Sequence, residues 1–296
     1  MSEPQFDFYD KTNLKSYNLN EKMRYQLNTL DKLDVFTRKH CEHVANLTCR
    51  LCEYLHCNKG FVEYCTICAY LHDIGKIFIP PQVLQKPGKL TDEEYEIMKT
   101  HTTLGYEICM KDLELRPYAA GALYHHEALN GSGYPQGLSK KDIPYEGQII
   151  RVADEYDAIV SKRQYKSHIG ISDTLKILIE NAQLGKNNPI IVKTLFKVVI
   201  DDIEYEIYCT QSYVEDLQSE IQRLKEIEKY YNKMQKATKD KDKQYYLNGI
   251  NILLKKDESI DNFKQLLIEY QTAYEKRKLI IDNLYNEIKI IKKLKI

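Results

Sequence analysis

The sequence His72-Asp73-Ile74-Gly75-Lys76 stands between a predicted helix, 61–71, and a segment rich in proline and glycine, 79–91. Imidazole nitrogens and carboxylate oxygens both bind divalent metals, so this segment is a candidate metal site. An adjacent His-Asp pair also arises by chance. Whether this segment binds a metal therefore depends on further candidate ligands elsewhere in the chain.

Four further histidines and one further carboxylate occur where such a site would need them. They are His40 before the segment and, after it, His101, His125, His126 and Asp154. One ion cannot comfortably use five histidines and two carboxylates, whereas two ions about 3.5–4 Å apart with a shared carboxylate can. Because these residues fall on several predicted helices, they indicate a binuclear site in the core of a helical bundle.

Apolar residues recur at spacings of three and four along most of the chain, and alternating strand patterns are nearly absent. The sequence therefore predicts an all-α protein. The expected helices, with boundaries good to about three residues, cover 20–33, 35–56, 61–71, 92–110, 117–129, 147–160, 171–181 and 189–208. The segments 79–91 and 130–146 hold most of the proline and glycine and are predicted as ordered loops.

Beyond about Tyr208 glycine and proline almost vanish, and two apolar stripes have the spacing of helices that bury a seam. The first contains Val214, Leu217, Ile221, Leu224, Ile227, Tyr231 and Met234, and the second contains Phe263, Leu267, Tyr270, Tyr274, Ile281, Leu284, Ile288 and Ile291. The charged segment 236–243 between them is predicted as a turn, which would give a helical hairpin. The stripes could instead pack on the rest of the chain or form a homodimer.

These patterns divide the chain of 296 residues into three parts. We expect a short polar segment at 1–24, a helical domain with the candidate site at 25–208, and a coiled-coil-like helical extension at 209–296.

Composition excludes several classes of function. Lys plus Arg and Asp plus Glu both number 43, so no global field draws the chain to a nucleic-acid polymer or an anionic membrane. The start lacks the apolar run of a signal peptide, and no stretch approaches the roughly 20 apolar residues of a membrane span. A cytoplasmic protein is therefore expected.

The eight cysteines are expected to be reduced thiols, since no export signal is present. The pairs Cys49/Cys52 and Cys65/Cys68 have the CxxC spacing of zinc sites. Both lie in continuous helical patterns without the turns of a zinc knuckle. We interpret them as small core residues.

The neighbourhoods of the candidate ligands resemble the HD-GYP family. The resemblance rests on 72–76, on the run from Ile79 through Lys86-Pro87-Gly88 to His101 and Gly105, on His125 to Pro135, and on Arg151 to Ala158. It covers about residues 35–205, including 185–192. It implies an HD-type helical bundle as the core of the protein.

By this resemblance, His40, His72 and Asp154 hold one metal and His101, His125 and His126 hold a second, with Asp73 as the bridge. The implied cofactors are two divalent ions, iron or manganese. Lys76 would stand beside the bridging solvent and steady the phosphate. Tyr134, in Gly133-Tyr134-Pro135, would shape the substrate site, and Arg163 and Lys166 would grip substrate phosphates.

The implied function is a phosphodiesterase that hydrolyses a cyclic dinucleotide with a metal-bridged hydroxide, with Asp73 and Lys76 as catalytic residues. Cyclic di-GMP is the first expected substrate, giving linear pGpG, GMP or both. The alternatives are cyclic GMP-AMP as substrate, another HD-superfamily activity such as nucleotide phosphohydrolysis or di-iron oxygenation, and a non-hydrolysing module that binds a dinucleotide or a partner.

Three positions depart from the family pattern. Phe36 stands four residues before His40, where some members have a glutamate for a third metal, so two metals are expected here. Asn130 and Lys162 each replace a usual aspartate. Neither replacement removes an expected ligand.

Overall fold

The computed structural model describes residues 35–161 and 170–295. The predicted helix 20–33, the polar segment 1–24, Lys162, Arg163 and Lys166 therefore lie outside the described residues. Within the described ranges the secondary structure is helical, with no strand beyond one isolated bridge between Asn130 and Ser139. The prediction of an all-α protein is confirmed.

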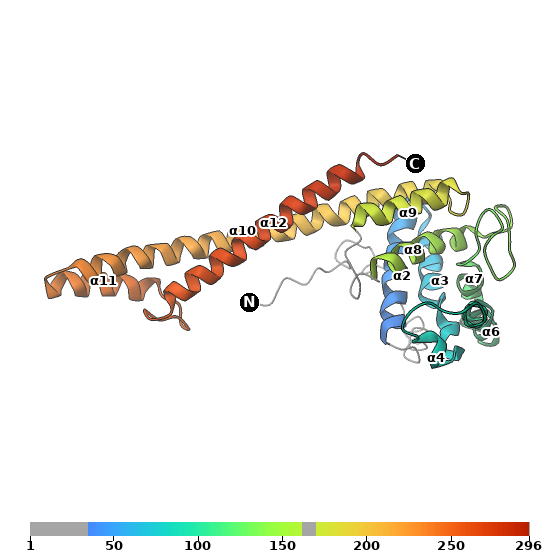
Figure 1. The fold of residues 1–296 in the computed structure, drawn as a ribbon, viewed down its shortest axis with the longest axis horizontal. Coiled ribbons are helices and arrows are strands. Elements are labelled where there is room, and N and C mark those ends of the chain that lie inside the picture. Colours follow the sequence, from blue (N-terminus) through green and yellow to red (C-terminus); the bar gives the residue numbers. More distant parts are fainter. Residues whose placement is uncertain (1–34, 162–169, 296) are drawn as a thin grey trace. The chain divides into compact units, whose positions relative to one another are not determined.

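The first helices carry the candidate site, and the last ones form the predicted extension (Figure 1). In chain order the helices are α2 Val35–Tyr54, α3 Lys59–Leu71, the 3₁₀ helix η4 Ile74–Phe78, α4 Pro81–Leu84, α5 Asp92–Lys99, α6 His101–Lys111, the 3₁₀ helix η5 Arg116–Tyr118, α7 Ala119–Tyr124, α8 Tyr145–Ser161, α9 Ile171–Gln183, α10 Pro189–Lys236, α11 Asp240–Leu253 and α12 Phe263–Ile291.

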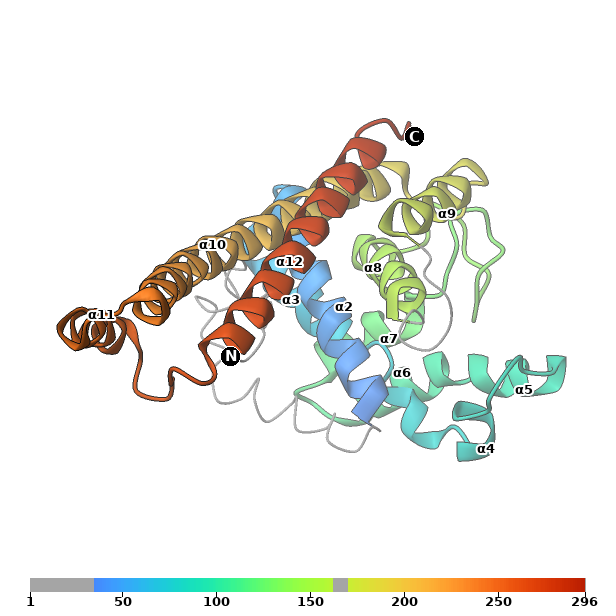
Figure 2. The same cartoon turned by 60° about the vertical axis from the view of Figure 1, so that its left-hand side comes forward.

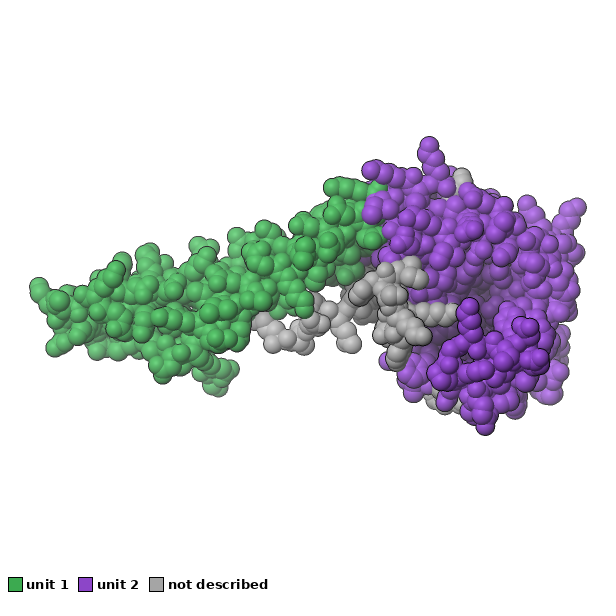
Figure 3. Space-filling view, viewed as in Figure 1, with its two compact units in different colours: residues 1–4, 203–289 green, residues 5–202, 290–296 purple. Residues whose placement is uncertain are grey.

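The described residues divide into two compact units, which Figure 3 shows in different colours. One unit contains 35–161, 170–202 and 290–295, and the other contains 203–289. No helix of the described chain is both long enough and apolar enough to cross a membrane.

The larger unit is built around α2, which packs on α3 and on α8, as Figure 2 also shows. The buried residues of α2 recur at helical spacing, among them Cys41, Val44, Leu51 and Cys52. A second group of contacts joins α6 to α7 and to η4. Together with the packing of α3 on α7, these contacts bring His72 after α3, His101 at the start of α6 and His125 after α7 close together.

All four cysteines of the CxxC pairs are buried and free of disulfides. The interpretation of these residues as core thiols is confirmed. Burial raises the pKa of the Cys49 thiol to about 12 and that of Cys65 well above its usual value. At neutral pH the Cys49 and Cys65 thiols are therefore protonated.

Two predicted helices were too long. The helix expected at 92–110 is interrupted at Thr100, whose hydroxyl donates to the Ile97 carbonyl at 2.6 Å. The imidazole of His101 donates to the Met98 carbonyl, also at 2.6 Å. Side chains thus take carbonyls that a continuing helix would have bonded.

The helix expected at 117–129 is shorter for the same reason. It ends at Tyr124, and His125 Nδ1 donates to the carbonyls of Gly121 and Ala122 at 2.9 and 3.0 Å. The loop predicted at 130–146 is largely confirmed, since α8 begins at Tyr145. The loop predicted at 79–91 contains the single turn α4.

The smaller unit is a helical hairpin in which α11 and α12 return along α10. Its buried core consists of Ile221, Leu224, Ile227, Ile250, Phe263 and Leu267. The two predicted stripes therefore pack against each other in this part of the chain. The domain boundary expected at residue 208 stays a prediction, and the homodimer stays one of the alternatives.

One detail of the extension was wrong, and the predicted turn was right in place but too long. The helix expected to end near Tyr208 runs on to Lys236, because no glycine or proline interrupts it and Ile203 and Ile207 continue the buried stripe. The turn expected at 236–243 is short, since α11 already begins at Asp240. A second bend, 254–262, separates α11 from α12.

Candidate metal centre

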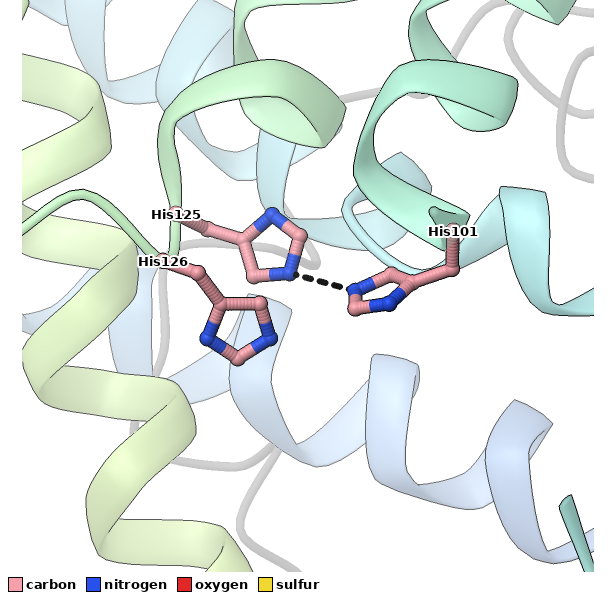
Figure 4. Close-up of side chains that lie close together, drawn as sticks. All are labelled: His101, His125 and His126. Atoms are coloured by element: carbon pink, nitrogen blue, oxygen red, sulfur yellow. Dashed lines mark hydrogen bonds between the residues drawn. The ribbon is translucent and has the colours of Figure 1, made fainter. Parts of the chain in front are cut away.

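All seven predicted metal ligands lie close together. Their ligand atoms form three groups, in each of which the atoms lie within 4.8 Å of one another: His101, His125 and His126; His40, His72 and Asp73; and His72, His125 and Asp154. Figure 4 shows the first group, in which the rings from α6 and from the end of α7 converge. The structure thus gathers residues that are 114 positions apart in the sequence, such as His40 and Asp154.

Most of these side chains are inaccessible to solvent. His72 and His125 are 0% exposed, and Asp73 and His101 are 1% exposed. His72 Nε2 and Asp73 Oδ1 are buried without a hydrogen-bond partner among the described residues. Buried polar atoms normally have partners, so each of these two atoms indicates that the cluster binds a ligand.

Three imidazoles are held in one tautomer by the backbone. His72, His101 and His125 each donate from Nδ1 to a carbonyl in the preceding helical turn, at 2.6, 2.6 and 2.9 Å. A neutral imidazole with its proton on Nδ1 has its lone pair on Nε2. Each helix end therefore presents one Nε2 ready for coordination.

The distance between the His101 and His125 rings shows whether one cation could bind both of their Nε2 atoms. Their Nε2 atoms lie 3.2 Å apart, the contact drawn in Figure 4. Burial lowers the pKa of both imidazoles, so both are neutral near pH 7. Two lone pairs at this distance repel each other unless a cation lies near both. The separation suits two nitrogens that are each about 2.1 Å from one ion.

Asp73 divides its two oxygens between two sets of histidines. Oδ1 lies 3.3 Å from His101 Nε2 and 3.9 Å from His125 Nε2. Oδ2 lies 3.4 Å from His72 Nε2 and 3.7 Å from His40 Nε2. Burial alone would raise the pKa of Asp73, but Lys76 and the surrounding imidazoles hold it well below its usual range. The carboxylate is therefore ionised.

Asp154 faces the same space from α8. Its Oδ1 lies 3.0 Å from His40 Nε2 and 3.9 Å from His72 Nε2, and its Oδ2 lies 3.9 Å from His126 Nδ1. Burial opposes ionisation, yet the hydrogen bond with His40 and the nearby imidazoles lower the pKa of Asp154.

His40 is oriented by a carboxylate that the sequence analysis did not single out. Its Nδ1 donates to Asp157 Oδ2 at 2.7 Å, which turns Nε2 toward Asp73 and Asp154. Burial by itself would lower the pKa of His40, but the hydrogen bonds with Asp154 and Asp157 raise it to about 10. Asp157 also lies near a second imidazole, with its Oδ1 3.4 Å from His43 Nδ1.

Lys76 and Tyr134 both border the cluster. The ammonium of Lys76 pairs with Asp73 Oδ2, and its side chain is 21% exposed. The ring of Tyr134 stacks on His126, with 4.7 Å between centroids and 26° between planes. Arg163 and Lys166, the predicted phosphate-binding residues, lie outside the described residues.

The Tyr134 loop is fixed by Glu127, which the sequence analysis also missed. Glu127 is 1% exposed and accepts from the backbone of Gln136 at 2.7 Å and of Leu138 at 2.8 Å. A glutamate directly after two histidines was the available signal.

Asn130, which replaces a usual aspartate, keeps a hydrogen bond that an aspartate could also make, since its Oδ1 accepts from Ser132 N at 3.1 Å. Its Nδ2 adds a donor that aspartate lacks, bonded to Leu184 O at 3.1 Å.

Helix ends that present buried imidazoles and carboxylates to a common centre define a helical protein of the metal-binding class. The chain belongs to the HD domain family, which matches residues 24–188. The HD-GYP resemblance seen in its motifs is confirmed by its relatives.

Three relatives illustrate the similarity. A cyclic di-GMP phosphodiesterase of Thermotoga maritima is 42% identical over 167 residues, covering 56% of this chain and 45% of the relative. The cyclic di-GMP phosphodiesterase response regulator RpfG of Xanthomonas campestris pv. campestris is 45% identical over 126 residues, covering 42% of this chain and 32% of the relative. The 3′3′-cGAMP-specific phosphodiesterase 1 of Vibrio cholerae is 31% identical over 159 residues, covering 54% of this chain and 37% of the relative. The chain spans less than half the length of each.

Proposed function

We propose that this protein is a metal-dependent phosphodiesterase that hydrolyses a cyclic dinucleotide, with cyclic di-GMP as its main substrate. The products would be linear pGpG, GMP or both. Two of the relatives described above are named for cyclic di-GMP and one for cyclic GMP-AMP. Their identity to this chain supports the reaction class and favours cyclic di-GMP.

The observation that carries the proposal is the division of Asp73 between two sets of histidines. Oδ2 lies near His40 and His72, and Oδ1 lies near His101 and His125. We assign His40, His72 and Asp154 to one divalent ion, His101, His125 and His126 to a second, and Asp73 to both. Iron and manganese both accept such a set of nitrogen and oxygen ligands.

Bound ions would supply an activated water near neutral pH and Lewis acidity toward the phosphodiester. The chain's own residues would prepare the rest of the reaction. The Lys76 ammonium lies beside Asp73, where it can neutralise charge that develops on phosphoryl oxygens. Tyr134 stacks on His126 and would hold this imidazole in place. Arg163 and Lys166 are proposed to hold substrate phosphates.

The proposal is tested by incubating the full chain, purified without oxygen and loaded with manganese or ferrous iron, with a panel of cyclic dinucleotides. Chromatography and mass spectrometry identify the products. We expect turnover of cyclic di-GMP to exceed that of cyclic GMP-AMP and cyclic di-AMP. The Asp73→Ala variant should lose activity by at least about a thousandfold, because both ions lose a shared ligand.

The matched control is Glu107→Ala, which removes an exposed carboxylate that lies 3.7 Å from Lys111 in the same helix, α6. This variant should retain wild-type activity. Tight binding of a dinucleotide without turnover by the fully metallated wild type would contradict the proposal and favour a binding module. Full activity of Asp73→Ala would exclude the assigned role of this residue.

A further inference from the structure

A line of aromatic rings leads from the histidine cluster toward solvent. Tyr134 stacks on His126 and meets the ring of His101 edge to face, with 6.5 Å between centroids and 83° between planes. On its other side, Tyr134 meets the ring of Tyr95 at 6.4 Å and 80°. Tyr95 therefore stands two ring contacts away from the candidate metal ligands.

Tyr95 is the member of this line that remains open. It is 47% exposed, although it lies in the middle of α5. Large aromatic side chains stabilise a fold chiefly by burial, and a half-exposed ring contributes less in this way. The exposed area is therefore available to a planar ligand.

The ring is also held in place. Lys99, one turn further along α5, lies with Nζ 5.0 Å from the Tyr95 centroid and 5.8 Å from the Tyr134 centroid. Its ammonium pairs with Glu96 at 2.6 Å. A cation over two rings favours their electron-rich faces and restricts their motion. A ligand that stacks here would meet a prearranged surface.

The start of α5 is anchored as well. Thr91 and Glu94 form a capping box, in which Thr91 N donates to Glu94 Oε2 at 2.8 Å and Glu94 N donates to Thr91 Oγ1 at 3.3 Å. Lys86 pairs with the same glutamate at 2.5 Å. These bonds fix Tyr95 on a rigid helix beside the cluster, although Tyr95 is not itself a candidate ligand.

We propose that Tyr95 is a specificity-determining residue that stacks on a purine base of the dinucleotide while a phosphate of the same molecule occupies the histidine cluster. The inference rests on the proposed function. Stacking suits a nucleobase because every base has a flat π-face, and it adds affinity without demanding a particular sequence. Tyr95 would then favour nucleotide phosphodiesters over simple ones.

Kinetics of Tyr95→Ala provide the first test. We expect KM for cyclic di-GMP to rise about tenfold or more, as loss of one stacked base predicts. The turnover number and the metal content should stay near wild type. Tyr95→Phe, which keeps the ring, should restore KM. Tyr208→Ala on α10, where Tyr208 is 68% exposed, serves as the control and should leave KM unchanged.

A spectroscopic test is available because the chain contains no tryptophan. Tyr95→Trp places the only tryptophan of the chain at the proposed stacking position, where its emission can be excited selectively over that of the tyrosines. Its emission should be quenched by a phosphorothioate analogue of cyclic di-GMP, which is hydrolysed slowly. The emission of Tyr208→Trp should not respond.

The outcomes separate this inference from the proposed function. A wild type that hydrolyses no cyclic dinucleotide contradicts the proposed function. An active wild type contradicts the inference alone if Tyr95→Ala leaves KM unchanged or if Tyr95→Trp shows no quenching. If Tyr95→Ala loses metal or folds poorly, the quenching of Tyr95→Trp decides the question.

Discussion

At the scale of one residue, Asp157 affects the candidate centre through the hydrogen bond that it accepts from His40. It is 8% exposed and accepts from His40 Nδ1 at 2.7 Å. Carboxylates in this position fix the tautomer and the orientation of a metal-binding imidazole. Asp157 thereby chooses which nitrogen of His40 faces Asp154.

We predict that Asp157→Ala weakens metal binding by about 10- to 100-fold, because His40 loses its orientation. Asp157→Asn should lie closer to wild type, since its amide oxygen can still accept from Nδ1. Calorimetric titration of the metal-depleted chain with manganese measures both effects. If Asp157→Ala binds manganese as tightly as wild type, Asp157 does not position His40.

Gly75 makes a second prediction at this scale. A Cβ on Gly75 would lie 2.0 Å from the His101 carbonyl oxygen and 2.5 Å from Gly105 N, so backbone would have to move. Gly75→Ala should therefore push η4 away from α6, separate Asp73 from His101 and destabilise the fold by about 1–3 kcal/mol.

Thermal unfolding and manganese affinity measure the effect of Gly75→Ala. Gly60→Ala is the matched control, because the nearest atom to the added carbon, Asn58 Oδ1, is 3.5 Å away, an ordinary van der Waals contact. The control should be neutral or slightly stabilising, as alanine is a better helix former than glycine. Equal behaviour of the two variants would show that the approach of η4 to α6 is not needed.

The candidate ligands could be found from the sequence because the same few residue types recur in short motifs with fixed neighbours. Asp157 and Glu127 could not be assigned roles in this way. The partner of Asp157 lies 117 residues earlier in the chain, and only the packing of α2 on α8 brings them together. Tyr95 was missed because an aromatic residue in a helix most often belongs to the core.

At the scale of secondary-structure elements, residues of the candidate site determine where α5 and α7 end, and local helix propensity does not. The side chains of His101 and His125 take backbone carbonyls at the ends of α5 and α7. No proline marks either break, so the periodic pattern predicted helices that were too long. The opposite error at α10 has the opposite cause, since nothing in its sequence stops the helix before Lys236.

In the hairpin unit, Arg223 joins α10 to the bend before α12. It donates to both carboxylate oxygens of Glu258 at 2.6 Å, to Leu253 O at 2.8 Å and to Glu220 at 2.8 Å. Arg223→Met should destabilise the hairpin by about 1.5–3 kcal/mol, the usual contribution of hydrogen bonds to charged groups. Hydrogen exchange of residues 250–263 should rise, whereas Lys229→Met, an exposed control, should have little effect.

The same contact predicts a dependence on pH. The bond from Arg223 lowers the pKa of Glu258, and bonds from Lys255 and Arg223 outweigh burial to lower that of Glu220. A carboxylate with a lowered pKa in the folded state stabilises it above the unfolded pKa of about 4.3, and this stability is lost as pH falls toward the folded value. The protection factors of the amides of 250–263, taken against intrinsic exchange at each pH, should therefore fall below about pH 4.3 in the wild type. A similar pH dependence in Arg223→Met would contradict the assignment.

At the scale of the whole molecule, α10 runs from one compact unit into the other. Periodicity predicted the helical class and the seam of the hairpin, because both depend on local spacing. It could not predict the oligomeric state, since a seam can be buried within a chain or between chains. Light scattering of the full chain will show whether the predicted homodimer forms.

The claim that joins these observations is that seven side chains hold two ions that act together. The most direct test is titration of the metal-depleted chain with manganese while hydrolysis of cyclic di-GMP is followed. We predict that turnover stays low up to one equivalent and reaches its maximum as the second is bound. Maximal turnover at one equivalent of manganese per chain would contradict the proposal that two ions act together.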